Sequence, residues 1–266
     1  MVFDGFFIYH LVQELNNELE KARLEKIYQT NEMSFVFVFY LRGQRRFMNL
    51  NLSSHNFGAY LTKKKDESTF NSQFLISLKR NLEGAILQNV SQYQTDRVMI
   101  FNFIMNDFID GSVSKQLVFE AMGRHSNLLI TKDELIVDTF KKMFFAEGRQ
   151  LIPQAKFEFF PTTKLPFLAI DYSKIFSYKD IIDQYMGVSP ILAKYLIEHN
   201  IQIPDIKINP TKQIGSKKSY VFDIFDQKEE KKYYSTISKL KDDQDIEQKV
   251  SVSSHQIFIE KQIKKL

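Results

Sequence analysis

Two neighbouring stretches of this chain, residues 34–40 and 47–52, have a side-chain period of two and are rich in aromatic and aliphatic residues. Arg42, Gly43 and Gln44 lie between them. Alternate side chains of a strand point to opposite faces, so two such stretches separated by a glycine predict an antiparallel hairpin. This feature constrains the fold most strongly, because it commits the first part of the chain to a sheet.

The pattern on either side of the hairpin predicts two helices and further strands. Asp4 is a suitable N-cap for a helix that continues to about Leu19, and a second helix over residues 71–82 ends before Gly84. The Asp110-Gly111 pair predicts one tight turn. Together these segments predict an α+β fold: a β-sandwich or flattened barrel with flanking helices. The further strands are expected near residues 85–94, 97–106, 115–122, 127–131 and 134–139.

From about Tyr172 the apolar spacing becomes helical. Gly187 interrupts it, Ser189 is the expected N-cap of the next helix, and Pro190 falls at its first position. This arrangement predicts a helix-hairpin-helix. We expect a β-rich domain over residues 1–160, a linker over 153–171, a helix-hairpin-helix domain over 161–205, and a C-terminal part over 206–266. The last part contains an expected strand at 219–225 and a Lys-rich segment that begins a coiled coil.

The composition excludes several classes of chemistry. The chain has no cysteine, which rules out disulfides, thiolate zinc sites and cysteine nucleophiles. It contains no phosphate-binding loop, no Gly-x-Ser-x-Gly and no His-Glu-x-x-His. The five histidines lack metal-ligand spacing. We therefore expect no enzymatic activity, no catalytic residue, no cofactor and no metal.

Charge and hydropathy bear on the partners. No apolar run approaches the roughly 18 residues of a membrane span, and the N-terminus has no secretory signal, so we expect a cytoplasmic protein that does not bind membranes. Residues 207–266 hold 13 basic and 9 acidic side chains, which accounts for the whole net charge of +4. The remaining part is neutral, and any polyanion must be bound there by local patches.

Three short motifs are candidate binding sites. Residues 120–127, Glu-Ala-Met-Gly-Arg-His-Ser-Asn, leave an apolar strand and suit either phosphate binding or a sharp turn in which Gly123 has a positive φ and His125 is buried. Asp96-Arg97 is either a local turn with a solvated arginine or a pair in which the carboxylate orients the guanidinium. Arg80 either contacts phosphate with Lys79 or pairs with Glu83 on its own helix.

With Met1–Gly5 and Asn81–Gly84, these motifs resemble the N-terminal domain of the NFACT family, in order from Met1 to about Lys241. The family includes the bacterial RqcH proteins, also called FbpA or fibronectin-binding proteins, and the eukaryotic NEMF proteins. The resemblance implies a factor of ribosome-associated quality control. Such a factor binds the large ribosomal subunit with peptidyl-tRNA and recruits tRNA for C-terminal alanine tailing of stalled chains.

The resemblance also assigns residues. It implies that tRNA or rRNA is bound by Asp96, Arg97, Arg124, His125, Asn127, Arg80 and Lys79. Gly187 and Ser189 would form the turn of the helix-hairpin-helix, which either binds phosphates through its backbone N–H groups or belongs to an ordinary helical hairpin used for packing or protein contact. Related proteins often have histidine where this chain has Asn81. In full-length members a long coiled coil and a second nucleic-acid-binding domain follow.

The NFACT domain is in turn similar to the N-terminal domain of formamidopyrimidine DNA glycosylases, which attack with an N-terminal proline beside a glutamate. Here Val2 and Phe3 stand at those positions, which implies the fold without the chemistry. Two alternatives remain open: a surface adhesin that binds fibronectin, and a truncated interaction module without tailing activity.

Overall fold

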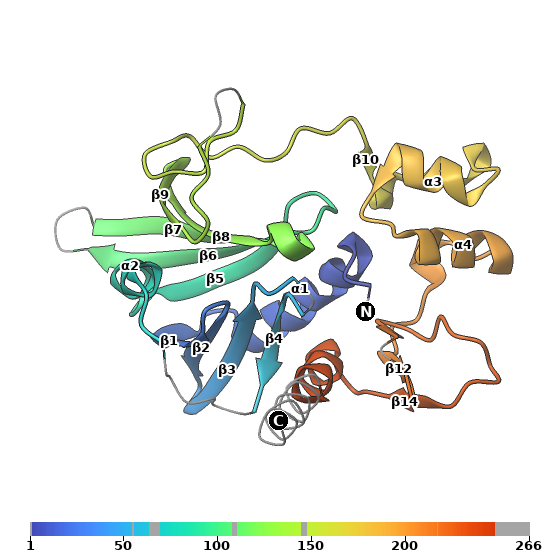
Figure 1. Ribbon diagram of the computed structural model, residues 1–266, viewed down its shortest axis with the longest axis horizontal. Helices are drawn as coiled ribbons and strands as arrows, with labels where there is room; N and C mark the ends of the chain where they lie inside the picture. Colours follow the sequence, from blue (N-terminus) through green and yellow to red (C-terminus); the bar gives the residue numbers. More distant parts are fainter. Residues whose placement is uncertain are drawn as a thin grey trace, which may run out of the picture.

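The computed structural model describes residues 2–247 apart from residues 55, 64–69, 108–110, 145–147 and 217. Its centre is one antiparallel sheet of nine strands in the order β4-β3-β2-β1-β5-β6-β7-β8-β9 (Figure 1). The strands are β1 (Arg23–Asn31), β2 (Ser34–Leu41), β3 (Gln44–Asn51), β4 (Gly58–Thr62), β5 (Ile86–Gln92), β6 (Val98–Asp107), β7 (Gly111–Glu120), β8 (Asn127–Lys132) and β9 (Leu135–Thr139). The predicted hairpin is confirmed as β2 and β3, and the later strands fall close to their predicted positions.

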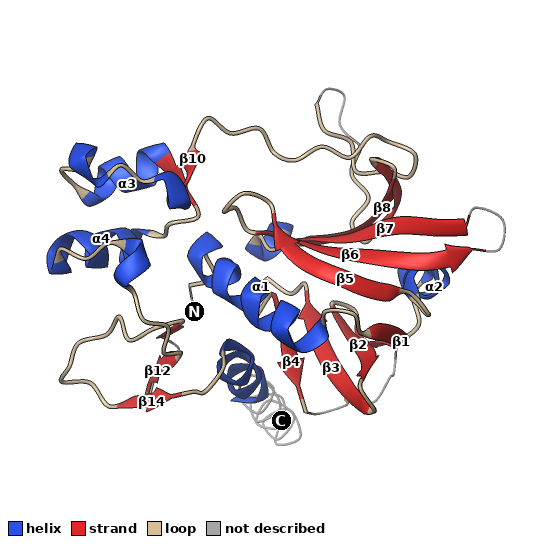
Figure 2. Cartoon of the chain, turned by 180° about the vertical axis from the view of Figure 1, so that it is seen from behind, coloured by secondary structure: helices blue, strands red, loops and turns tan. Residues whose placement is uncertain are grey.

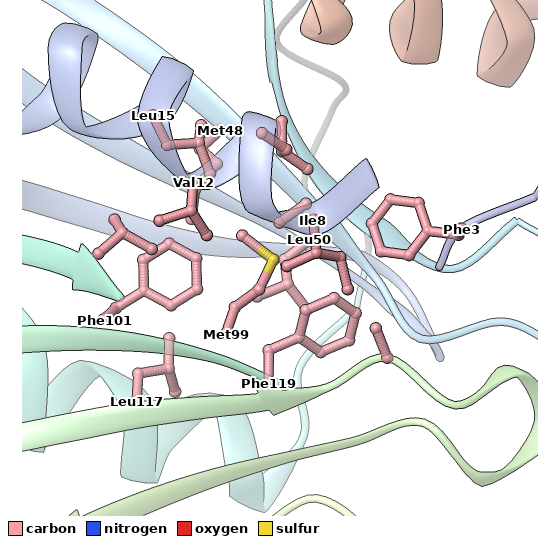
Figure 3. Packing of buried hydrophobic residues seen from close by; sticks show 14 of the residues in the cluster. Phe3, Ile8, Val12, Leu15, Met48, Leu50, Met99, Phe101, Leu117 and Phe119 are labelled. Carbon is pink, nitrogen blue, oxygen red and sulfur yellow. The ribbon is translucent and has the colours of Figure 1, made fainter. Parts of the chain in front are cut away.

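Helix α1 (Gly5–Leu19) begins as predicted, because the Asp4 carboxylate accepts the Phe7 N–H at 2.9 Å. The helix lies across the sheet with its first turn toward the helical part of the molecule (Figure 2). Its side chains Ile8, Val12 and Leu15 are buried. Figure 3 shows them beside Met48 and Leu50 of β3 and above apolar residues of two further strands, namely Met99 and Phe101 of β6 and Leu117 and Phe119 of β7.

The sheet is bent between β1 and β5. Arg23 and Ile86 are the one residue pair in strand register there, and further main-chain hydrogen bonds join residues 21–24 to residues 84–87. Phe39 of β2 stacks on Phe103 of β6 with ring centroids 6.4 Å apart, so the halves face each other across the core. The large antiparallel sheet is therefore confirmed. In the described part of the chain β4 and β9 are the two edges of one open sheet, so the predicted β-sandwich or flattened barrel takes the form of a single bent sheet that does not close.

Both edges are covered, which explains how an open sheet avoids pairing with other chains. At β4, the Leu61 N–H donates to the Ser238 hydroxyl at 3.0 Å, and Ser238 lies on a helix over residues 237–247. At β9, the Ile136 N–H donates to the Ala155 carbonyl at 2.9 Å. Residues 153–157, predicted as part of a linker, thus complete the sheet.

Helix α2 (Gln73–Leu82) confirms the second predicted helix, with Ser72 as its N-cap. Gly84 follows with φ of +89°, a left-handed conformation that ends the helix. The predicted strand over 219–225 is wrong in extent. Only β13 (Ser219–Tyr220) is a strand, beside β12 (Thr211–Gln213) and β14 (Lys231–Tyr233), because Val221 and Phe222 leave the small sheet to enter the core.

Two further helices, α3 (Tyr178–Gln184) and α4 (Pro190–His199), pack together (Figure 1). Ser189 is the N-cap of α4 and Pro190 its first residue, as predicted. The short strands β10 (Leu165–Pro166) and β11 (Tyr185–Met186) pair beside them. Four short 3₁₀ helices complete the elements: η1 (Gly123–His125), η2 (Phe167–Ala169), η3 (Tyr172–Lys174) and η4 (Ile203–Asp205).

One hydrophobic core crosses the predicted domain boundaries. The Phe6 ring lies 5.7 Å from Phe167 and 6.1 Å from Phe222, so the sheet part, the helical part and the C-terminal part meet at one side chain. Within the described residues, no helix is both long and apolar enough to cross a membrane. Asp110 and residues 248–266 of the expected coiled-coil segment lie outside the described residues.

Candidate functional site

A groove of about 540 Å³ lies where the sheet meets the helical part. It brings together two motifs that are about ninety residues apart in the sequence: the turn between β5 and β6, and the turn between α3 and α4. Its lining includes Asp96, Arg97, Lys164, the residues Met186–Pro190, the N-terminal residues Val2–Gly5, and Phe57.

Thr95 holds the two turns together. Its side chain is fully buried, and its hydroxyl donates to the Met186 carbonyl at 3.0 Å and accepts the Phe167 N–H at 3.2 Å. Gly187 lies against the same turn, with its carbonyl accepting the Phe6 N–H at 2.9 Å. The backbones approach so closely that a Cβ on Gly187 would lie 2.2 Å from the Thr95 carbonyl oxygen. The groove is thus bounded by a rigid contact between three segments.

Asp96 organises the main chain beside the groove. Its carboxylate accepts the Arg97 N–H at 2.7 Å, and its carbonyl accepts the Gln92 side-chain amide at 2.7 Å. The carboxylate therefore fixes the turn, as in the local-turn interpretation, and contacts the main chain of Arg97 rather than its guanidinium. The Arg97 side chain is exposed, which leaves the five donors of its guanidinium facing solvent at the groove.

The 120–127 motif lies beside Arg97, because the Ala121 N–H donates to the Arg97 carbonyl at 2.8 Å. Gly123 has φ of +60°, which confirms the predicted positive value. Arg124 and His125 are exposed and bonded to each other at 2.9 Å between Nε and Nε2. The alternative in which His125 is a buried imidazole is therefore wrong, since the 3₁₀ turn η1 points it to solvent.

Asn127 has a structural environment. It is 2% exposed, its amide donates to the Thr139 hydroxyl and the Lys141 carbonyl at 3.1 Å each, and its oxygen accepts the Lys141 N–H at 2.8 Å. These bonds use the polar atoms on both sides of the amide. Asn127 therefore fixes β8 to the segment after β9, and we do not place it among the surface contacts.

A buried ion pair lies at the start of the 120–127 motif, where β7 ends. Glu120, the last residue of β7, pairs with Arg149, and burial raises the pKa of the Glu120 carboxyl. The Arg149 guanidinium lies 5.2 Å from the Phe157 ring centroid and 4.5 Å from that of Phe160. The sequence did not predict Arg149, because nothing in its neighbourhood along the chain indicates that it pairs with the last residue of β7.

Two backbone donors at the turn between α3 and α4 are bonded within the protein. The Ser189 N–H donates to the Asp4 carboxylate at 3.3 Å, and the Ser189 hydroxyl accepts the Leu192 N–H at 3.5 Å. Asp4 also accepts the Tyr220 hydroxyl at 2.7 Å. A carboxylate of the protein itself thus lies at the N-terminus of α4, the place that a phosphate occupies in the predicted arrangement. Gly187 and Ser189 therefore join the segments around the groove, as in the packing alternative, and phosphate binding at this turn stays a prediction.

Lys79 and Arg80 lie elsewhere. They belong to α2, which lies at the far end of the sheet from α3 and α4 (Figure 1). The Glu83 carboxylate accepts the Ile27 N–H at 2.8 Å, so the ion pair with Arg80, one of the two alternatives, is replaced by a contact that joins α2 to β1.

Lys164, by contrast, was not predicted, yet it is exposed and lines the groove with Arg97. No local pattern distinguishes Lys164 from other surface lysines. Among the residues in the described ranges, no group of acidic or histidine side chains forms a metal site.

Asp4→Ala is expected to lower the free energy of unfolding by about 3 kcal/mol, because the helix cap is worth about 1 kcal/mol and each buried donor left unpaired costs about 1–3 kcal/mol. Urea unfolding measures the loss. Asp171→Ala is the matched control: Asp171 caps η3 at the surface, and we expect a loss below about 1 kcal/mol. Equal losses in the two variants would show that Asp4 does not join the three segments.

The fold is that of mixed α/β proteins built on one large antiparallel sheet. The sequence matches the family described as NFACT N-terminal and middle domains over residues 4–263, and the chain belongs to this family. The Rqc2 homolog RqcH of Streptococcus pneumoniae is 32% identical over 171 residues, which cover 62% of this chain and 31% of that protein. RqcH of Streptococcus suis is 29% identical over 224 residues, which cover 78% of this chain and 40% of that protein. The chain therefore spans less than half the length of these relatives.

Solved structures confirm the architecture. The N-terminal part of the fibronectin/fibrinogen-binding protein from Streptococcus suis superposes with a TM-score of 0.79 at 24% identity, covering 90% of this chain and 97% of that chain. The fibrinogen binding protein from Staphylococcus aureus superposes with a TM-score of 0.76 at 21% identity, covering 91% and 98%. At these identities the likeness concerns the fold alone.

Proposed function

We propose that this chain is an RNA-binding module of ribosome-associated quality control. The observation that carries the proposal is the placement of Arg97 and Arg124. The two exposed guanidinium groups come from adjacent strand ends, joined by the bond between the Ala121 N–H and the Arg97 carbonyl, beside a groove. Arginines with free guanidinium donors on a rigid support are suited to phosphate and base edges. The relatives named RqcH support the quality-control role.

In the finer form of the proposal, the module binds tRNA on a large ribosomal subunit that carries peptidyl-tRNA, and so recruits tRNA for alanine tailing. Arg97, Arg124 and His125 contact the RNA. Lys164, whose ammonium donates to the Ile182 carbonyl at 2.6 Å, adds a cation in the lining of the groove. The ribosome makes the bonds, so the chain acts as a non-enzymatic positioning factor in the cytoplasm. Because the chain spans less than half of its RqcH relatives, we expect tailing to require parts that these residues do not supply.

We propose that the helix-hairpin-helix and the likeness to the glycosylase fold reflect common ancestry and do not imply a direct contact with RNA. We propose that the pair α3 and α4, joined by a turn in which Gly187 has a positive φ, is a helix-hairpin-helix. Since its first N–H group is bonded to Asp4, its role in our proposal is to support the groove rather than to bind phosphate.

Arg97→Ala is expected to weaken binding to large ribosomal subunits bearing peptidyl-tRNA about tenfold, because one charge-assisted contact to RNA is lost. Cosedimentation across a salt series measures this, and the slope of log affinity against log salt should become shallower. Arg80→Ala removes an exposed arginine on α2, away from the groove, and should bind like the wild type. Unchanged binding of Arg97→Ala, with the fold intact, would refute the assignment.

A second candidate function is fibronectin binding. It is favoured by the names of the solved structures, one of which is a fibronectin/fibrinogen-binding protein. The same two variants distinguish it: immobilised fibronectin that captures the wild type and Arg97→Ala equally, with no cosedimentation of the wild type with ribosomal subunits at low salt, would favour the adhesin.

A further inference from the structure

The helix over residues 237–247 is fixed at its start by polar contacts with distant segments. Both oxygens of the Glu14 carboxylate, on α1, accept N–H groups of its first turn, from Ile237 at 2.7 Å and Ser238 at 3.0 Å. A carboxylate is favourable there because unpaired N–H groups give the start of a helix a partial positive charge. With the bond from Leu61 to Ser238, this holds the helix along the edge of β4.

One turn further on, the helix buries a lysine. Lys241 is 1% exposed, and its ammonium donates to the Asn56 side-chain oxygen at 3.1 Å. The Asn56 amide in turn donates to the Asp245 carboxylate, one turn along the same helix. The loop after β3 is therefore held by two side chains of the helix at once. A buried charge requires such partners, so the contact is specific in its geometry.

The same lysine contacts the wall of the groove. Its ammonium lies 5.5 Å from the centroid of the Phe3 ring. Phe3 meets Phe57 edge to face at 5.4 Å, and both rings line the groove. Phe57 is also the neighbour of Gly123, since a Cβ on that glycine would lie 3.8 Å from the Phe57 ring. Phe57 thus lies between the lysine and the turn that carries Arg124.

We propose that Lys241 and Asn56 are positioning residues for the groove. Docking of the 237–247 helix determines where the Phe3 and Phe57 rings lie. It thereby couples the chain that continues from this helix to ligand binding in the groove. The part that concerns RNA rests on the proposed function. The coupling between helix and aromatic wall rests on the contacts alone. Such coupling needs a packed connection between the two places, and Lys241, Asn56, Phe3 and Phe57 provide one.

A single fluorophore can test the coupling, because the chain contains no tryptophan. Phe57→Trp places a reporter in the groove wall. Lys241→Met is then compared with Lys212→Met in this background. Lys212 is a matched control: it is a buried lysine that contacts the same helix through Glu247, but from β12 of the small sheet. Far-UV circular dichroism confirms that the variants are folded, and Lys241→Gln replaces Lys241→Met if the latter does not fold.

We expect Lys241→Met to shift the tryptophan emission to longer wavelength and to increase its quenching by acrylamide, with Lys212→Met unchanged. In chains that retain Phe57, Lys241→Met should weaken binding of deacylated alanine tRNA on the order of threefold to thirtyfold. Equal emission in the two lysine variants would overturn the coupling. A shifted emission with wild-type affinity would overturn its link to RNA. A shifted emission with no tRNA binding by any chain would support the coupling and refute the proposed function.

Discussion

Gly187→Ala is expected to destabilise the fold by about 4 kcal/mol, at the upper end of the range for single substitutions. Two effects combine. Gly187 has φ of +87°, where a side chain costs about 1–2 kcal/mol. The added Cβ would also lie 2.2 Å from the Thr95 carbonyl oxygen and 2.9 Å from the Phe167 ring. The oxygen belongs to the main chain of Thr95, which is buried, and it cannot move without separating the helical part from the sheet.

Gly84→Ala separates the cost of a positive φ from the clash of the added Cβ. Gly84 has nearly the same φ, +89°, but no atom lies within 4 Å of the position of its Cβ. We expect a loss of about 1–2 kcal/mol from conformation alone. Urea unfolding of both variants gives the difference, which measures the close approach of the Gly187 turn and Thr95. If both glycines cost the same, the contact that bounds the groove is not tight in solution.

The local patterns of the sequence predicted the local structure well. The cap of α1 by Asp4, the β2–β3 hairpin and the positive φ of Gly123 each depend on residues within a few positions of one another. The same residues did not indicate how the elements assemble. Two sheets, a barrel and one bent sheet all have the same alternation along their strands. The short contact between β1 and β5, which makes this one sheet, has no signature in the sequence.

In the candidate site too, the sequence predicted local features but not the contacts between distant segments. The sequence identified Arg97 and Arg124 as exposed residues of special turns, and the structure places these turns side by side. Asn127 was predicted as an RNA contact from the 120–127 motif, but the segment around Lys141 covers it. Asp4 was predicted only as a cap of α1. Its bonds to Ser189 and Tyr220 join residues more than 180 positions apart, which no periodicity can indicate.

The free energy of unfolding is expected to rise with pH between about pH 7 and pH 10, because of Lys241. Burial lowers the pKa of this lysine to about 7, and the charge of Asp245 offsets only part of the effect. Below pH 7 the lysine is protonated in the folded and the unfolded chain, and its burial destabilises the fold fully. Between pH 7 and the value of 10.5 in the unfolded chain, only the unfolded chain binds the proton. Stability therefore rises by about 1.4 kcal/mol for each pH unit in this range, about 3–5 kcal/mol in all.

Urea unfolding of the wild type and of Lys241→Met at several pH values isolates this contribution, since other groups that titrate in the range are common to both. The difference in unfolding free energy, wild type minus variant, should increase from pH 7 to pH 10 and level off above. Lys239→Met removes an exposed lysine from the same helix and serves as the control. A difference that stays constant with pH would mean that Lys241 keeps its proton when folded. Its bond to Asn56 would then be one between a cation and an amide at every pH, and the 237–247 helix would remain docked on the groove wall with the same strength throughout.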